Sequence, residues 1–324
     1  MIKRTVICLL IVLGALLVAF AAFCLLKSER TLSFVPKTEI TANYNNYVYA
    51  NSLDYYSNVF AWKRGGLLGS ELITVDGSGN DSRTRIGADR FQCIGEKTVR
   101  LNNGILVANG GERIASEVDS FVAFDCGMLY LKQTDSDDSV LYWYDTTDKS
   151  HTEVMQDVLA YCVDEGRIVI LQNDGWLSVC SEDSVERTVR IEVPYLPFRF
   201  MLFQDCAVYP EKNDIFLVNI LTGEKKTVAF TERIYANDRL VYICDDEQIF
   251  VSFGATNTNG SIVSSVDDPA NGLWKIDPVT FAAEKVSERF FDELYLFGGE
   301  LFGISGDNVY QISASSKEIK MITE

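Results

Sequence analysis

The chain has 324 residues, of which 47% are hydrophobic and 12% aromatic, and its formal net charge at pH 7 is −17. Such an acidic surface repels the phosphates of nucleic acids and anionic lipid headgroups, so we expect no nucleic-acid partner. The sequence contains one histidine and no Cys-x-x-Cys pair. A histidine-rich metal site and a zinc ribbon are thereby excluded, and we expect no metal and no other cofactor.

An uncharged segment, residues 5–26, follows a basic tip formed by residues 1–4. A helix of 22 residues spans about 33 Å, enough to cross the ~30 Å hydrocarbon core of a bilayer. A cleaved signal peptide is the alternative, because Ala19-Phe20-Ala21 fits a small-x-small cleavage site. The apolar run continues past that site, which favours a retained anchor. We therefore predict a single-pass protein of the cell membrane with a cytoplasmic tip, a linker over residues 27–43 and an extracytoplasmic C-terminal domain.

Beyond the linker, a short apolar strand that ends on a turn-forming polar residue recurs seven times. The closing polar residues are Asp76, Asn109, Asp145, Ser181, Asn219, Asp277 and Ser313. They are 33, 36, 36, 38, 58 and 36 positions apart, and the outlier equals one ordinary period plus about 22 further residues. A fixed period filled with strands is typical of a β-propeller.

Each period divides into four short β-prone runs separated by Gly, Asp, Asn and Ser. In the third period these runs are residues 120–124, 128–131, 140–144 and 151–155. The recurring strand is apolar at positions of opposite parity, as expected where a sheet is packed between two others. We predict an all-β fold, a seven-bladed β-propeller over residues 44–324, with six or eight blades as the alternatives.

The first recurring strand carries a resemblance to a known group of propellers. Leu72-Ile-Thr-Val-Asp-Gly-Ser-Gly79, followed by Arg85-Ile86, resembles the strand–turn–strand of TolB-like propellers. The arrangement as a whole is similar to membrane-anchored propeller proteins of unknown function from Gram-positive bacteria. The resemblance covers residues 44–324 as architecture, and it implies the propeller fold without implying any catalytic residue.

Six cysteines lie beyond the anchor, at Cys93, Cys126, Cys162, Cys180, Cys206 and Cys244. An exported location permits disulfides. However, Cys93 and Cys162 occupy similar first-strand positions two blades apart, and so do Cys126 and Cys206. Such positions lie beyond the ~7 Å Cα separation that a disulfide allows. We interpret most of these cysteines as small buried hydrophobic residues.

Two sets of loops open on the face where propellers usually bind their ligands: those joining second to third strands and those joining successive blades. We call this side the loop face. Acidic and aromatic residues predicted there are Asp135, Asp137, Asp138, Asp174 and Trp176. The insertion in the sixth period, residues 254–271, adds Asn257 and Asn259 near its tip and Asp267 and Asp268 at its base. Long loops on rigid scaffolds often carry function, so these residues are the candidate ligand- or partner-binding site.

Solvated turns are the simpler interpretation of most of these acids, because similar acids occur on the opposite face. His151 likewise fits an exposed turn better than a catalytic pair, and no catalytic residue is assigned. The leading hypothesis is a non-catalytic binding or scaffold module for an exported protein, a peptide or a cell-wall glycan. The alternative is a hydrolase or lyase that uses a pair of loop-face carboxylates on a glycan.

Overall fold

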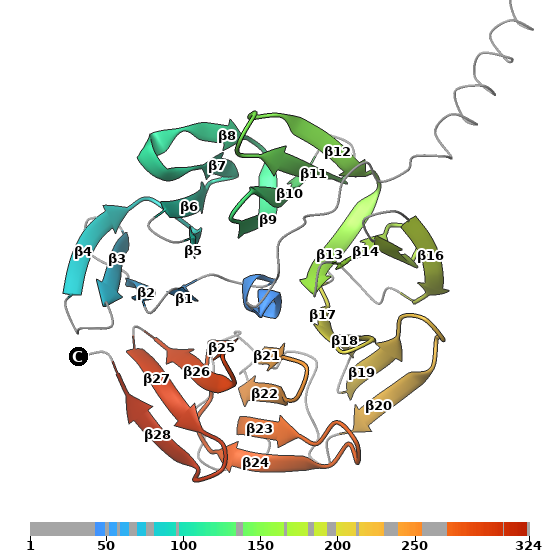
Figure 1. Ribbon diagram of the computed structural model, residues 1–324. Coiled ribbons are helices and arrows are strands. Elements are labelled where there is room, and N and C mark those ends of the chain that lie inside the picture. The colour runs from blue at the N-terminus through green and yellow to red at the C-terminus, as the bar shows by residue number, and fades with distance from the viewer. Residues whose placement is uncertain are drawn as a thin grey trace, which may run out of the picture.

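The computed structural model describes residues 43–48, 52–56, 59–64, 70–75, 81–94, 97–133, 139–164, 167–180, 185–192, 199–211, 214–229, 239–254, 271–306 and 308–322. These residues form seven four-stranded antiparallel sheets, arranged around a central axis as the blades of a propeller (Figure 1). The predicted all-β, seven-bladed architecture is thus confirmed.

Every blade is a meander of four consecutive strands running from the axis to the rim. Blades one to four contain β1 (Leu53–Tyr56), β2 (Val59–Arg64), β3 (Ser70–Val75) and β4 (Asp81–Ile86); β5 (Arg90–Ile94), β6 (Lys97–Asn102), β7 (Ile105–Val107) and β8 (Arg113–Ala115); β9 (Val118–Phe124), β10 (Gly127–Gln133), β11 (Ser139–Asp145) and β12 (His151–Met155); β13 (Val158–Asp164), β14 (Arg167–Gln172), β15 (Trp176–Cys180) and β16 (Val185–Arg190). Blades five to seven contain β17 (Met201–Phe203), β18 (Cys206–Glu211), β19 (Asp214–Asn219) and β20 (Lys225–Ala229); β21 (Arg239–Cys244), β22 (Ile249–Gly254), β23 (Gly272–Ile276) and β24 (Ala283–Ser287); β25 (Glu293–Phe297), β26 (Glu300–Ser305), β27 (Asn308–Ser313) and β28 (Glu318–Met321).

The seven recurring sequence segments coincide with the third strands of the seven blades. Both faces of these strands are packed, as their parity predicted. In β11, Trp143 joins the cluster shared with blade four, while Tyr144 joins the cluster shared with blade two. The core therefore consists of apolar layers between adjacent blades, and each blade depends on its neighbours for burial.

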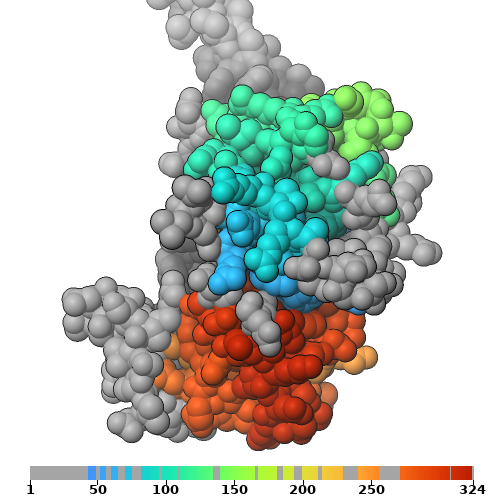
Figure 2. Space-filling view, turned by 90° about the vertical axis from the view of Figure 1, so that its left-hand side faces the viewer, coloured from blue at the N-terminus to red at the C-terminus, as the bar shows by residue number. Residues whose placement is uncertain are grey.

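Among the described strands, none from one end of the chain completes a sheet from the other end, since β1–β4 and β25–β28 each form a four-stranded blade. The ring closes instead through side chains between blades one and seven, where the blue and red segments meet in Figure 2. Leu53 of β1 packs with Tyr295, Phe297 and Phe302 of blade seven. The Phe60 and Phe302 ring centroids are 5.5 Å apart. We refer to this contact as the closing seam.

A short 3-10 helix, η1 (Tyr44–Tyr47), lies at the centre of the ring and is buried throughout (Figure 1, blue). Asn43 caps it, because its side-chain oxygen accepts a hydrogen bond from the Asn45 amide at 3.1 Å. The Tyr44 ring lies 5.1 Å from that of Phe124, and the Tyr47 hydroxyl donates to Asp54. Residues 44–47, expected at the start of the first blade, thus belong to a central plug, which we define as residues 43–48.

The plug runs along the axis in the direction opposite to the inner strands. Asn43 and Asn45 bind the carbonyl of Cys244, the last residue of β21. Further along, the Val48 carbonyl accepts from Arg199, which precedes β17, and Ser52 binds Glu293, the first residue of β25. The plug therefore begins on the side opposite the loop face, and Ser52, just before β1, lies at the loop face.

Among the described residues, none of the helices is long and apolar enough to cross a bilayer. The predicted anchor, residues 5–26, and the linker up to residue 42 lie outside the described residues.

Candidate functional site

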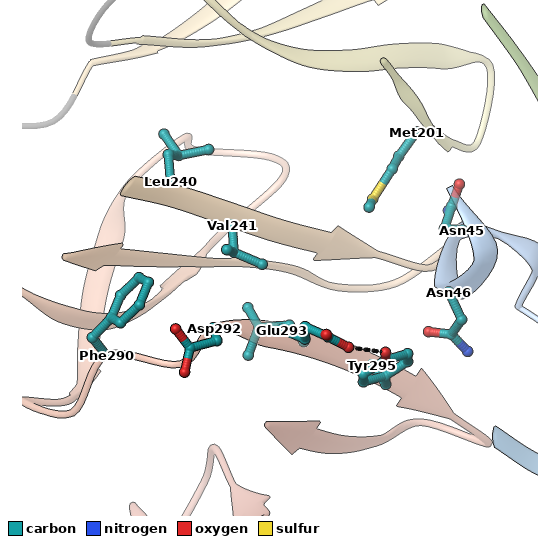
Figure 3. Close-up of a pocket in the computed structure, with 10 residues that line it drawn as sticks. Asn45, Asn46, Met201, Leu240, Val241, Phe290, Asp292, Glu293 and Tyr295 are labelled. Carbon is teal, nitrogen blue, oxygen red and sulfur yellow. Dashed lines mark hydrogen bonds between the residues drawn. The ribbon is translucent and has the colours of Figure 1, made fainter. Parts of the chain in front are cut away.

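A cavity of about 260 Å³ lies beside the plug at the loop face, between blades five, six and seven. We call it the axial pocket (Figure 3). Its walls come from the plug, from the starts of three inner strands and from the segment that leads into blade seven. The lining residues are Asn45, Asn46, Met201, Leu240, Val241, Phe290, Asp292, Glu293, Leu294 and Tyr295.

Glu293 is held in place on the wall of the axial pocket. Its carboxylate accepts hydrogen bonds from the Tyr295 hydroxyl and, at 2.8 Å, from the Ser52 hydroxyl across the closing seam. The Tyr295 oxygen in turn accepts from the Ser52 amide at 2.8 Å. Burial lowers the pKa of nearby Lys63, and the Glu293 charge partly offsets that effect. A carboxylate offers about four acceptor positions, so Glu293 retains capacity for a ligand.

A second carboxylate, Asp292, precedes Glu293 and accepts a hydrogen bond from the Gly306 amide at 2.9 Å. The remaining walls are largely apolar, with Leu240 and Val241 on one side and Phe290 on another. The pocket therefore combines two acids with surfaces suited to hydrocarbon. Such a combination fits a ligand group that carries a positive charge on an apolar stem. The charge would bind the two carboxylates, and the stem would pack against the apolar walls.

The blade-six insertion leaves its sheet close to the axial pocket. A side-chain carbon at Gly254, the last described residue before the insertion, would lie 2.8 Å from the Phe290 ring. Phe290 lines the pocket, so the absence of a side chain at Gly254 permits this packing. The insertion thus starts beside the pocket wall, although residues 255–270 themselves are outside the described part of the chain.

Two of the predicted site residues can be located. Asp174 is exposed in the turn between β14 and β15, where it accepts from the Trp176 amide at 3.2 Å and lies 3.6 Å from Arg187. Trp176 is half-buried, as expected. Neither residue lines the axial pocket. The other seven predicted residues fall outside the described residues: Asp135, Asp137, Asp138, Asn257, Asn259, Asp267 and Asp268.

Sequence reasoning missed the residues that do line a cavity. Asp292 and Glu293 are two acids among many turn acids, and nothing in their spacing sets them apart. Asn45 and Asn46 carried a stronger signal, because the run Asn43-Tyr-Asn-Asn-Tyr47 precedes the first strand and lacks strand periodicity. Polar amides beside aromatic residues indicate a segment that is buried and hydrogen-bonded rather than a solvated linker.

The described residues also contain groups that bear on catalysis. His151 is exposed, its Nδ1 lies 2.9 Å from the Tyr130 hydroxyl, and partial burial lowers its pKa. No three His, Cys, Asp or Glu side chains in the described ranges lie close enough to hold a metal ion. None of the six cysteines in those ranges forms a disulfide, and burial raises the pKa of the Cys93, Cys162 and Cys180 thiols to about 12.

No family model matches this chain, and no curated protein sequence does so either. Among solved structures, it is similar to the β-propeller domain of the Trilobed protease from Pyrococcus furiosus, at 9% identity and a TM-score of 0.56, over 86% of this chain and 98% of that one. That propeller is described as having an open velcro topology. The likeness shows the fold alone.

Two peptidases resemble the chain to a similar degree. The Pyrococcus horikoshii acylaminoacyl peptidase is 10% identical, with a TM-score of 0.55, over 86% of this chain and 53% of that one. A Mycobacterium tuberculosis puromycin-hydrolyzing peptidase is 10% identical, with a TM-score of 0.54, over 90% and 56%. The chain thus spans about half the length of each peptidase. These likenesses support the propeller and do not extend to the TolB-like group or to a Gram-positive source.

Proposed function

We propose that this protein is a membrane-anchored, extracytoplasmic β-propeller that acts as a non-catalytic binding or scaffold module, with the axial pocket as its ligand site. The axial pocket is the observation that carries the proposal. It lies on the loop face, next to the base of the one long insertion, and presents two fixed acids between apolar walls. The resemblance of residues 72–86 to TolB-like propellers agrees with an exported binding module.

The direction of the plug supports an orientation in which the loop face is turned away from the membrane. Because the plug begins on the side opposite the loop face, we infer that an anchor over residues 5–26 would lie on that side and leave the loop face pointing away from the membrane. The axial pocket would then be open to proteins or wall polymers outside the cell. The net charge of −20 beyond residue 30, from 25 basic and 45 acidic residues, adds long-range attraction for a basic partner.

The ligand that fits best is a segment of an exported protein or peptide that presents a lysine or arginine side chain. The apolar stem of such a side chain would pack on Leu240, Val241 and Phe290, and its charged head would reach Asp292 and Glu293. Glu293 is pre-oriented by Ser52 and Tyr295, so little ordering cost accompanies binding.

A crosslinking pull-down from native membranes tests the proposal. The double variant Asp292→Asn, Glu293→Gln removes both charges and should reduce recovery of an exported partner at least tenfold, equivalent to about 1.4 kcal/mol or more. The control is Glu247→Gln, an exposed acid on the opposite face of blade six. Equal recovery by the parent and the double variant would refute the axial pocket as the site.

Deleting residues 256–267 tests the role of the insertion. Shortening a loop changes its closure entropy little, so the variant should melt within a few degrees of the parent. Partner recovery should fall, because the insertion starts beside Phe290. Unchanged melting with full recovery would show that the insertion is not part of the site.

A carboxylate-dependent hydrolase or lyase acting on a glycan is the second candidate, favoured only by the presence of two carboxylates on one pocket. Activity on a panel of cell-wall glycans that disappears in Glu293→Gln would establish it. Absence of turnover, together with unaltered partner recovery in a glycan-free preparation, would contradict the enzyme and support the binding module.

A further inference from the structure

Two buried hydrogen-bond donors near the loop-face mouth of the channel have no partner among the described residues. They are one terminal nitrogen of Arg90, Nη1, and the hydroxyl of Tyr161, a residue only 8% exposed. Burial raises the pKa of the Tyr161 phenol and the neighbouring Ser120 side chain lowers it, although the two side chains do not lie in hydrogen-bonding geometry. A buried donor left without a partner is costly, and most in the case of a cation. An occupant that accepts hydrogen bonds is the physical explanation for such a pair.

Arg90 and Tyr161 lie close enough to affect each other's pKa, and both are affected by Arg199 and Asp119. Arg90 and Arg199 stand at equivalent places, each four residues before the end of its inner strand, β5 and β17. Burial lowers the pKa of Arg90, and the positive charge of Arg199 lowers it further, while Asp119 and Tyr161 partly offset these effects. Two guanidinium groups and a phenol hydroxyl thus share this side of the channel with the Asp119 carboxylate, and the exposed carboxylate of Asp89 acts on Arg90 more weakly.

Asp119 is already committed to one of the two guanidinium groups. Arg199 contacts Asp119 Oδ2 at 3.2 Å and donates to the Val48 carbonyl at 2.5 Å, which fixes it against the plug. Arg90 is therefore the cation with bonding capacity to spare. Asp89, the other acid that acts on Arg90, already accepts a hydrogen bond from the Asn103 amide. Unfilled donors beside two guanidinium groups therefore favour an anion over a neutral occupant.

We propose that Arg90 and Tyr161, with Arg199 beside them, form an anion-binding subsite that takes a carboxylate group. A carboxylate has two oxygens, so it can accept from the guanidinium with one and from the phenol hydroxyl with the other, and the charged pair strengthens both bonds. The subsite extends the proposed binding role of the loop-face mouth. The axial pocket at blades six and seven takes the cationic part of a partner, and this side of the mouth takes an acidic side chain or C-terminus.

The test uses the full-length chain in detergent, titrated with sodium acetate and with inorganic phosphate at constant ionic strength. Calorimetry and melting temperature are both recorded, because a ligand that binds the folded state raises the melting temperature. Saturable acetate binding is expected for the parent. Arg90→Gln should weaken it at least tenfold and Tyr161→Phe about threefold or more. Arg113→Gln, which removes an exposed arginine on the outermost strand of blade two, β8, should bind acetate as the parent does.

Tyr161→Phe provides a readout that does not depend on binding. Without added anion it should melt no lower than the parent, since it removes an unpartnered buried hydroxyl. Absence of saturable acetate binding in the parent, or equal binding by all variants, would overturn the subsite. Binding of phosphate but not acetate would overturn the carboxylate assignment.

A peptide arm identifies the source of the carboxylate. A short acetylated peptide with a free C-terminus should bind more tightly than its C-terminally amidated form, and equal affinity would exclude the C-terminus in favour of an acidic side chain. The test needs no captured partner. Acetate binding without partner capture would support the subsite and contradict the proposed function. Partner capture without acetate binding would support the proposed function and contradict the subsite.

Discussion

Amide side chains complete the inner edge of the ring at the scale of single residues. The Asn45 side chain binds both the amide and the carbonyl of Leu202, at 2.9 and 2.7 Å. Asn46 does the same to Leu296, at 2.8 Å for both bonds, and Gln92 to Ala123, at 2.7 and 2.8 Å. Inner strands present an unpaired edge to the channel. These amides act as substitutes for a neighbouring strand.

Replacing Asn45 tests this role. Asn45→Leu has a similar volume but offers no partner to the Leu202 peptide group, which is buried. At about 1–3 kcal/mol for each unsatisfied group, we expect the free energy of unfolding to fall by roughly 3 kcal/mol. Denaturant unfolding monitored by tryptophan fluorescence measures the change, with Asn308→Ala at an exposed position as the control. A loss below 0.5 kcal/mol, the level of surface substitutions, would contradict the role.

Asp54 predicts a pH dependence of stability. Its carboxylate accepts from Tyr47 and from the backbone amides of Tyr55 and Cys93. Burial nevertheless raises its pKa from 3.8 to about 6, and these hydrogen bonds offset only part of that effect. Because the folded-state pKa is raised, the stabilisation is fully present below about pH 4 and is lost as the pH rises through about 6.

Asp54→Asn removes this titration. At about 1.4 kcal/mol per pKa unit, the stability of the parent relative to the variant should fall by roughly 3 kcal/mol between pH 4 and pH 7. Unfolding free energies of both proteins across this range measure the difference, and the shared titration of other acids cancels. Parallel curves for parent and variant would show that Asp54 has an ordinary pKa.

At the scale of elements, the closing seam joins the first and last blades through side-chain packing. In other propellers a strand shared between the two chain ends can make this connection. Tyr295 and Phe297 stack in parallel with centroids 5.9 Å apart, and Phe297 and Phe302 meet edge to face at 6.0 Å. Across the seam, Tyr55 lies 6.1 Å from Phe297. Offset and edge-to-face aromatic pairs add stability beyond the area they bury, so this cluster substitutes for backbone hydrogen bonds between the chain ends.

Phe302→Ala should therefore loosen blades one and seven together. A buried Phe→Ala change costs about 3–5 kcal/mol, and hydrogen exchange should accelerate in β1 and β25 more than in β9 and β13. Phe121→Ala, at the interface of blades two and three, is the matched control, whose effect should centre on β5 and β9. Equal acceleration in all blades for both variants would contradict a local role of Phe302 in joining blades one and seven.

The elements also show how far sequence reasoning reaches. The third strands were predictable because each keeps apolar residues on both faces, a pattern that Leu141, Trp143 and Tyr144 display and that local chemistry dictates. The plug was not, because its bonds to Leu202 and Leu296 join residues more than 150 positions apart. The axial pocket was not predictable for the same reason. Asp292 and Glu293 line a pocket only because the plug, which is distant in sequence, forms another of its walls, and Ser52 beside β1 orients Glu293.

At the scale of the whole molecule, plug, seam and pocket meet in one place. Asn45 and Asn46 join the plug to blades five and seven and also line the axial pocket. Glu293 binds Ser52 across the seam and faces the same pocket. A ligand in the axial pocket would contact the segment that leads to the proposed anchor, and its binding should stabilise ring closure by mass action.

Site-specific photocrosslinking in native membranes tests the central claim, that the loop-face mouth is the binding surface. One crosslinking amino acid replaces Leu240, which lines the axial pocket. Another replaces Val279, an 85% exposed residue in the turn between β23 and β24 on the opposite face. We expect a reproducible crosslink to an exported partner from position 240 and none from position 279. A partner crosslinked from position 279 alone would contradict it.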